Sequence, residues 1–118
     1  MHVRCLIVDD NARFCEEARG LLVEQGIDVV GTAASSAEAL RHAAVLAPDV
    51  ALVDIDLGGE SGLDLAHRLH GGSAEPPRII LVSTHDESEY ADLIAASPAA
   101  GFLAKNDLSA EAIRRLLG

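Results

Sequence analysis

Short apolar runs alternate along the chain with longer segments in which apolar side chains recur at helical spacing. The short runs are rich in valine, isoleucine and leucine, and three of them are almost continuously apolar. Such runs are expected of strands that are buried on both faces of a parallel sheet. The predicted strands are residues 3–8, 27–31, 50–53, 78–82 and 101–104.

The segments between the strands predict helices, and several of their ends carry capping or stop signals. Candidate caps are Ser35 with Glu38, Asp86 with Glu89, and Ser109, while Gly26, Pro48 and the pair Gly71–Gly72 mark helix ends. One stripe of each helix is expected to face the core: Phe14, Ala18, Leu21 and Leu22; Leu40, Ala44 and Ala47; Leu65, Ala66 and Leu69; Tyr90, Leu93 and Ile94; Ile113, Leu116 and Leu117.

Five strand–helix units therefore account for the chain. Strict alternation of strands and helices is typical of a parallel sheet that is covered by helices on both faces. No internal repeat or linker interrupts the pattern, and 118 residues is the usual size of one domain. We interpret residues 1–118 as a single α/β domain.

The formal net charge of −10 decides which partners we expect. An acidic surface repels phosphate backbones and anionic lipids, so direct contact with nucleic acid or with a membrane is not expected. No apolar run approaches membrane-spanning length and no signal peptide opens the chain, so a cytoplasmic location is expected. The two cysteines, Cys5 and Cys15, are expected to pack as small hydrophobic residues.

The polar residues that could carry chemistry follow the predicted strands. In an open parallel sheet, ligands bind beyond the carboxyl ends of the strands. The residues found there are Asp9 and Asp10 after the first strand, Asp54 and Asp56 after the third, Ser83 and Thr84 after the fourth, and Lys105, the chain's only lysine, after the fifth. We therefore expect acidic, hydroxyl and amine groups to meet at one edge of the sheet.

Carboxylates brought together in this way raise one another's pKa, and a divalent cation removes the conflict. Mg²⁺ suits such a site because it takes hard oxygen ligands. Asp10 and Asp54 are candidate direct ligands, the backbone carbonyl of Asp56 is a third, and Asp9 could hold a metal-bound water. Carboxylates can act as nucleophiles that form aspartyl-phosphates, and Lys105 could pair first with Asp54 and then with a phosphoryl oxygen.

Each motif taken singly also has a plain structural explanation. An Asp-Asp pair after a strand is often a turn and a helix cap, and an Asp-x-Asp sequence before two glycines is often a polar loop. Ser83 and Lys105 alone could be an ordinary strand-end hydroxyl and a surface charge. The set nevertheless falls at one edge in complementary roles, with Ser83 and Lys105 each able to bind a phosphoryl oxygen, so it favours phosphoryl chemistry.

These same residues resemble the receiver domains of bacterial response regulators. The resemblance is carried by the runs 6–11, 50–57, 80–83 and 101–105, and by Gly62, eight residues after Asp54. It covers essentially the whole chain. The run Lys105-Asn106-Asp107-Leu108 and the segment 86–90 are most similar to receivers of the LuxR/NarL class, which are associated with transcription regulation.

The resemblance implies a flavodoxin-like, doubly wound (βα)5 fold with strand order 2-1-3-4-5. It implies that a sensor histidine kinase phosphorylates Asp54 in the presence of Mg²⁺, with Asp9 and Asp10 as the metal-binding acidic pair. Lys105 would bind the phosphoryl group. Whether the chain also pairs with a second copy of itself in a homodimer is left open by the sequence.

The resemblance also implies a switch and an output surface. Ser83 and Phe102 would change rotamer together, with the hydroxyl moving to the phosphoryl group and the ring turning inward. The output surface would be formed by the fourth helix, the fifth strand and the fifth helix.

The sequence departs from the receiver pattern at two positions. Asn106 stands where many receivers have a proline joined by a cis peptide bond, and a cis bond before another residue costs about 3 kcal/mol. Gly58 stands where many receivers have another proline, so with Gly59 this loop is expected to be unusually flexible.

Three other classes of protein were weighed. A haloacid-dehalogenase-type phosphatase uses similar groups, but its nucleophile motif comes first in the chain, whereas here the pair Asp9–Asp10 leads. A receiver-like interaction module that takes no phosphate ranks lower, because all the expected side chains are present. A dinucleotide-binding domain fails because the first strand runs into Asp9–Asp10 and not into a glycine-rich turn.

Overall fold

The computed structural model describes residues 3–84 and 89–118. Within them one parallel sheet has the order β2-β1-β3-β6-β7. Its strands are β1 (Arg4–Val8), β2 (Asp28–Ala33), β3 (Val50–Asp54), β6 (Arg78–Ser83) and β7 (Gly101–Ala104). The predicted (βα)5 fold with strand order 2-1-3-4-5 is therefore confirmed, and each strand lies within about two residues of its expected bounds.

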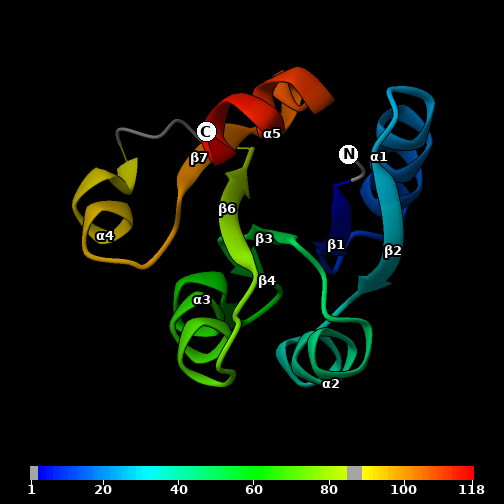
Figure 1. The fold of residues 1–118 in the computed structure, drawn as a ribbon. Helices are drawn as coiled ribbons and strands as arrows, with labels where there is room; N and C mark the ends of the chain where they lie inside the picture. Colours follow the sequence, from blue (N-terminus) through cyan, green and yellow to red (C-terminus); the bar gives the residue numbers. More distant parts are fainter. Residues whose placement is uncertain (1–2, 85–88) are drawn as a thin grey trace.

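Helices cover both faces of this sheet, as Figure 1 shows. They are α1 (Ala12–Glu24), α2 (Ser36–Leu46), α3 (Gly62–Gly71), the short α4 (Ala91–Ala95) and α5 (Ala110–Leu117). The buried side chains of α1 and α5 pack on one face and those of α2 and α3 on the other. The sheet thus separates two hydrophobic clusters, one on each of its faces.

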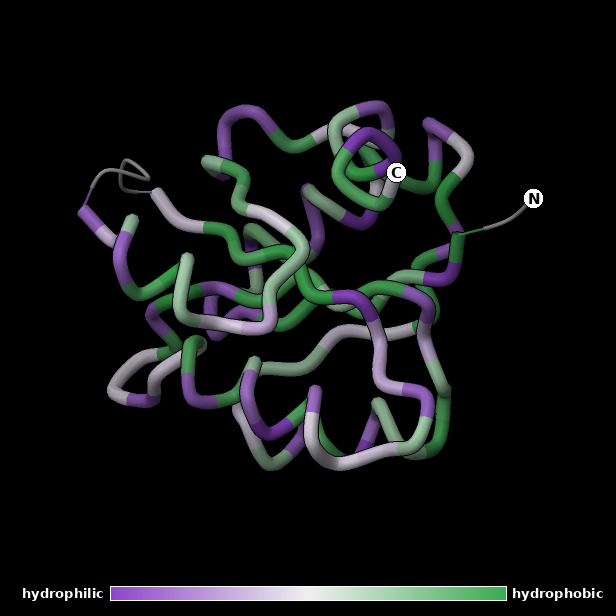
Figure 2. Tube along the Cα trace, turned by 60° about the vertical axis from the view of Figure 1, so that its left-hand side comes forward, coloured by the Kyte–Doolittle hydropathy of each residue, from purple (hydrophilic) through white to green (hydrophobic). Residues whose placement is uncertain are grey.

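Side chains that alternate along the strands supply both clusters. Cys5 and Ile7 of β1 face the α1–α5 side, whereas Leu6 and Val8 face the α2–α3 side, and all four are completely buried. This is the physical reason why the strands read as continuous apolar runs. In Figure 2 the strongly hydrophobic stretches run mostly through the middle of the molecule.

The helix ends confirm most of the predicted caps. Ser35 and Ser109 each accept a hydrogen bond from the backbone three residues on, at Glu38 and Ala112. The Glu38 carboxylate accepts from the backbone of Ala34, one residue before the capping serine. The cap expected at Asp86 lies outside the described residues.

Three of the predicted buried stripes are partly wrong. Leu21 of α1 and Leu93 of α4 are exposed, at 38% and 56%. In α2 the side chains that pack inward are Ser36, Ala39, Leu40 and Ala43, whereas Ala44 and Ala47 are exposed. Ala47 lies past the end of the helix in a left-handed conformation with φ of 47°, so it belongs to the turn and not to the packed face.

The pair Gly58–Gly59, where the sequence predicted a flexible loop, forms a two-residue turn; its flexibility stays a prediction. It joins the short antiparallel strands β4 (Asp56–Leu57) and β5 (Glu60–Ser61). Both glycines have positive φ, at 60° and 102°, and positive φ at both central residues is what a tight hairpin turn requires. The segment that follows Asp54 is therefore a small hairpin.

Further local features bear on the remaining expectations. The peptide bond between Lys105 and Asn106 is trans, and it opens the 3-10 turn η2 (Lys105–Asp107). Cys5 and Cys15 are free and buried, as predicted, and burial raises the pKa of the Cys5 thiol to about 12. Across residues 3–84 and 89–118, no helix is both long enough and apolar enough to span a bilayer.

Candidate functional site

A hollow of about 260 Å³ lies where the carboxyl ends of β1, β3, β6 and β7 meet. It is lined by Asp9, Asp10, Asn11, Asp54, Asp56, Gly58, Ser83, Thr84 and Lys105. Every residue that the sequence analysis placed at this edge therefore lines one space. The arrangement follows from the parallel sheet, because all of these strands point the same way.

Three carboxylates form the acidic part of the hollow. Asp9 and Asp54 are buried, with exposed fractions of 1% and 7%, whereas Asp10 is exposed. One oxygen atom from each lies within 4.8 Å of the others. An all-oxygen donor set with one exposed member fits a hard divalent cation that keeps part of its water shell.

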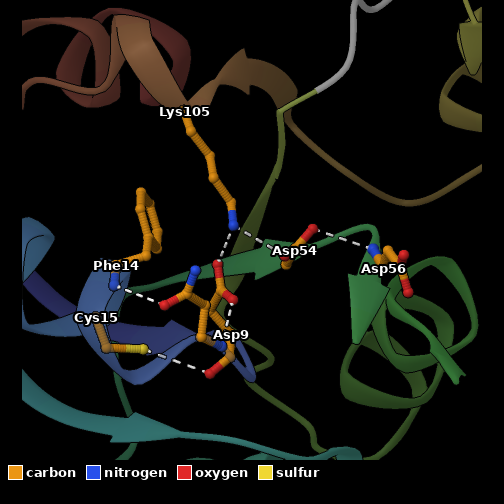
Figure 3. Close-up of polar contacts among 7 residues, drawn as sticks. Asp9, Phe14, Cys15, Asp54, Asp56 and Lys105 are labelled. Carbon is orange, nitrogen blue, oxygen red and sulfur yellow. Dashed lines mark hydrogen bonds and ion pairs between the residues drawn. The ribbon is translucent and has the colours of Figure 1, made fainter. Parts of the chain in front are cut away.

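Lys105 provides the positive charge of the site. Its Nζ atom lies 2.6 Å from Asp9 Oδ2 and 3.1 Å from Asp54 Oδ2, as Figure 3 shows. Burial acts to lower the pKa of Lys105, but its hydrogen bonds to Asp9 and Asp54, together with the negative charge of both carboxylates, outweigh burial and hold that pKa above its usual value. The ammonium group therefore stays charged between two carboxylates.

For Asp54, burial is the strongest influence on the pKa. Burial raises the pKa of its carboxyl group above the usual value, and the nearby Asp9 carboxylate adds to the rise. The backbone N–H of Asp56, which donates to Asp54 Oδ1 over 3.1 Å, and the Lys105 ammonium act against this without cancelling it. The Asp54 carboxylate is thus partly desolvated, and each of its two oxygen atoms has a polar partner.

Phe14 is part of this site, although the sequence analysis placed it only on the apolar stripe of the first helix. Its ring centroid lies 4.3 Å from Lys105 Nζ. The backbone N–H of Phe14 donates to Asn11 Oδ1 over 3.2 Å, and that of Asn11 donates to Asp9 Oδ1 over 2.9 Å. The two hydrogen bonds are the local turn and helix cap that an Asp-Asp pair before a helix can form. The contact of the ring with Lys105 has no sequence signal, because it depends on how the first turn of α1 sits against the end of β7.

Two glycines allow the backbone to pack closely around the acids. A Cβ atom at Gly62 would lie 1.9 Å from the carbonyl oxygen of Asp54, and one at Gly58 would lie 2.5 Å from Asp10 Oδ2. The hairpin that carries Gly58 is also tied to α2, because the Glu60 carboxylate accepts from the backbone of Ser36 over 3.0 Å. Both glycines stand out in the sequence, whereas these contacts do not.

The remaining predicted residues are placed as follows. Ser83 is 3% exposed at the end of β6, and Phe102 on β7 is partly buried against the α2–α3 cluster. The Asp56 side chain is exposed and is not among the clustered carboxylates of the described residues. The roles predicted for Ser83 and Phe102 as a switch, and for the Asp56 carbonyl as a ligand, stay predictions.

Comparison with known proteins matches residues 5–117 to the family model of the response regulator receiver domain. The chain is 34% identical over 116 residues to a probable transcriptional regulatory protein, NarL, of Mycobacterium tuberculosis. The alignment covers 98% of this chain and 53% of that protein, so the chain spans about half the length of this relative.

Solved structures agree with this match. The signal receiver domain of the putative response regulator NarL from Mycobacterium tuberculosis superposes with a TM-score of 0.85 at 32% identity, covering 98% of this chain and 94% of that one. A response regulator protein from Burkholderia pseudomallei has a TM-score of 0.82 at 29% identity, covering 98% and 66%. That structure is described as containing a phosphorylated aspartic acid, a calcium ion and citrate.

Proposed function

Because the chain belongs to the response regulator receiver domains, which act in two-component signalling and are not turnover enzymes, we propose that Asp54 is its phosphoacceptor. The observation that carries the proposal is the position of Asp54 at the end of β3, 3.1 Å from Lys105 Nζ and clustered with Asp9 and Asp10. The related Burkholderia pseudomallei structure, with its phosphorylated aspartate, supports an acceptor in this family.

The phosphoryl group would come from the phosphohistidine of a sensor kinase. The phosphorus–nitrogen bond breaks with its electron pair staying on the imidazole, and a new bond forms between phosphorus and an Asp54 carboxylate oxygen. The reaction needs positioning and charge neutralisation more than it needs acid–base chemistry. The partly desolvated Asp54 carboxylate is suited to this because fewer waters must be removed from it.

Asp9, Asp10 and Asp54 are the residues that would hold Mg²⁺, with the backbone carbonyl of Asp56 as a further ligand. The clustered, oxygen-only donor set of the three carboxylates fits this ion. When bound, the ion supplies positive charge that offsets the negative charge of the transferring phosphoryl oxygens.

Lys105 then exchanges partners. At rest its ammonium group pairs with Asp54, and after the transfer it pairs with a phosphoryl oxygen on the same residue. Ser83, at the end of the neighbouring strand β6, offers a hydroxyl to a second phosphoryl oxygen. Movement of Ser83 would free space for the Phe102 ring and change the surface formed by α4, β7 and α5.

We base the proposed cellular role on the related proteins. We expect a cytoplasmic signalling protein with a histidine kinase as its partner, a homodimer as one output state, and transcription regulation as its output, as the name of the NarL relative describes for that protein. The acidic charge of −10 supports an output that does not pass through direct DNA contact by these residues.

Intact-mass analysis after incubation with acetyl phosphate tests the proposal. The wild type should gain one phosphoryl group in the presence of Mg²⁺ and none in the presence of EDTA, and Asp54→Asn should gain none under either condition. Asp56→Asn is the matched control, because it makes the same change on an exposed side chain and should still be labelled. If the wild type stays unlabelled, or if Asp54→Asn is labelled equally, the chain is an interaction module that takes no phosphate at Asp54.

A further inference from the structure

We propose that Phe14 is a positioning residue for Lys105, whose ammonium group is held over the aromatic face of Phe14 and so directed at Asp9 and Asp54. The inference deepens the proposed function, because the consequence for phosphorylation rests on Lys105 serving the phosphoryl group. The contact itself is a property of the resting protein and can be measured there.

The geometry around Nζ carries the inference. The ring centroid lies 4.3 Å away, well within the approximately 6 Å over which an ammonium group is attracted to the face of an aromatic ring. Two carboxylate oxygens, at 2.6 Å and 3.1 Å, occupy other sides of the same group. The Lys105 side chain is only 12% exposed, so water competes weakly for the ammonium group.

The acidic loop holds the backbone of Phe14, from which the ring projects. Asp9 Oδ1 accepts from the backbone of Asn11, and Asn11 Oδ1 accepts from the backbone of Phe14. The ring then faces Lys105, and Lys105 returns to Asp9 through Oδ2. These contacts join the start of α1 to the end of β7, and Figure 3 shows Phe14, Asp9 and Lys105 side by side. A shift of any of these residues would move the ammonium group relative to Asp54.

A lysine needs such a constraint more than an arginine would. Its ammonium group sits on a flexible stem of four carbon atoms and makes no bidentate contact with a carboxylate. When Asp54 becomes phosphorylated, Lys105 has to move from the carboxylate to a phosphoryl oxygen while remaining in the site. A ring face attracts the charge without fixing one hydrogen-bond direction, so it permits this exchange and limits departure into solvent.

The competing explanation is that Phe14 only packs, since it is partly buried against the α1–α5 cluster. Leucine and pentafluorophenylalanine separate the two explanations. Leucine fills much of the space without an aromatic face, and fluorination keeps the ring while removing the negative potential of its face. Phe14→Tyr keeps that potential and is the conservative control.

The first readout is the NMR signal of the Lys105 ε-methylene group in the unphosphorylated protein. Because Lys105 is the only lysine, selective ¹³C-lysine labelling gives one side-chain signal without further assignment. The wild type and Phe14→Tyr should show protons shifted upfield by the ring. Phe14→Leu and site-specific pentafluorophenylalanine at 14 should both move the signal from its wild-type position, the first because the ring is absent and the second because the ammonium group leaves the ring face. A signal unmoved by fluorination overturns the proposal.

The second readout is the rate at which acetyl phosphate labels Asp54. Stepwise fluorination should lower this rate progressively, by about three- to tenfold at full fluorination, while Phe14→Tyr stays near the wild type. On a Lys105→Met background, Phe14→Leu should cause no further loss. A flat fluorination series, or an equal loss by Phe14→Leu with and without Lys105, would mean that Phe14 only packs. An unlabelled wild type would reject the proposed function, and the NMR series would still decide the positioning role.

Discussion

At the scale of single residues, a glycine packs directly against the backbone of Asp54. Gly62 begins α3 and donates its N–H to the carbonyl of Ile55 over 2.7 Å. A Cβ atom there would lie 1.9 Å from the carbonyl oxygen and 2.7 Å from the carbonyl carbon of Asp54. These are backbone atoms of a central strand, so they cannot move aside as a side chain would.

Gly62→Ala is therefore expected to lower the free energy of unfolding by about 3 kcal/mol, at the upper end of the cost of overpacking. Gly20→Ala is the matched control, since Gly20 lies at an exposed position of α1, where an added Cβ meets nothing within 4 Å outside its own helix. That control should be neutral or stabilise by up to about 1 kcal/mol. Urea unfolding followed by circular dichroism measures both, and equal midpoints for Gly62→Ala and the wild type would refute the packing argument.

The charged residues of the site could be predicted from the sequence, but the contact of Phe14 with Lys105 could not. Asp9, Asp54 and Lys105 follow predicted strands, and a parallel sheet brings its carboxyl ends to one edge whatever the details of packing. No such rule predicts the position of Phe14. Its contact with Lys105 depends on the packing of α1 against the end of β7, which an apolar stripe does not specify.

At the scale of elements, the strands were easier to predict than the helix faces. Burial on both sides gives a strand a continuous apolar run that leaves little freedom in its bounds. The second helix contains alanines at 39, 43 and 44, whose small side chains pack or face solvent with little difference in free energy. Its predicted face was consequently rotated by about one residue from the observed one, which comprises Ser36, Ala39, Leu40 and Ala43.

The β4–β5 hairpin brings its turn against one of the clustered carboxylates. It places the backbone of Gly58 against the Asp10 carboxylate. Gly58→Ala should displace that carboxylate and weaken Mg²⁺ binding about tenfold, equivalent to about 1.4 kcal/mol. Affinity can be measured by isothermal titration calorimetry.

Gly59→Ala separates the collision from backbone strain. Gly59 also has positive φ, at 102°, but nothing lies within 4 Å of an added Cβ. Both variants should therefore lose stability through the strained backbone, by about 1 kcal/mol or more, while only Gly58→Ala should lose affinity for the ion. Equal losses of affinity in the two variants would show that the turn conformation, and not the contact with Asp10, governs the site.

At the scale of the whole molecule, the acidic site and the net charge of −10 both favour the binding of cations. Three carboxylates are clustered, and one lysine pairs with two of them, so the folded state carries uncompensated repulsion at the carboxyl edge of the sheet. Binding of a divalent cation to the folded state alone should relieve this repulsion and stabilise the protein.

The expected stabilisation by Mg²⁺ is about 2.7 kcal/mol at a free concentration one hundred times the dissociation constant. Thermal unfolding should show it as a rise in the melting temperature that EDTA reverses and that Asp10→Asn abolishes. Because the whole chain is acidic, general screening of its charge could also stabilise it, and NaCl at matched ionic strength isolates that effect. Asp28→Asn, which removes one exposed carboxylate at the start of β2, controls for the change in net charge and should retain the response. If NaCl reproduced the rise, or if Asp10→Asn and Asp28→Asn lost it equally, the stabilisation would come from the total charge and the carboxylate cluster would not be a metal site.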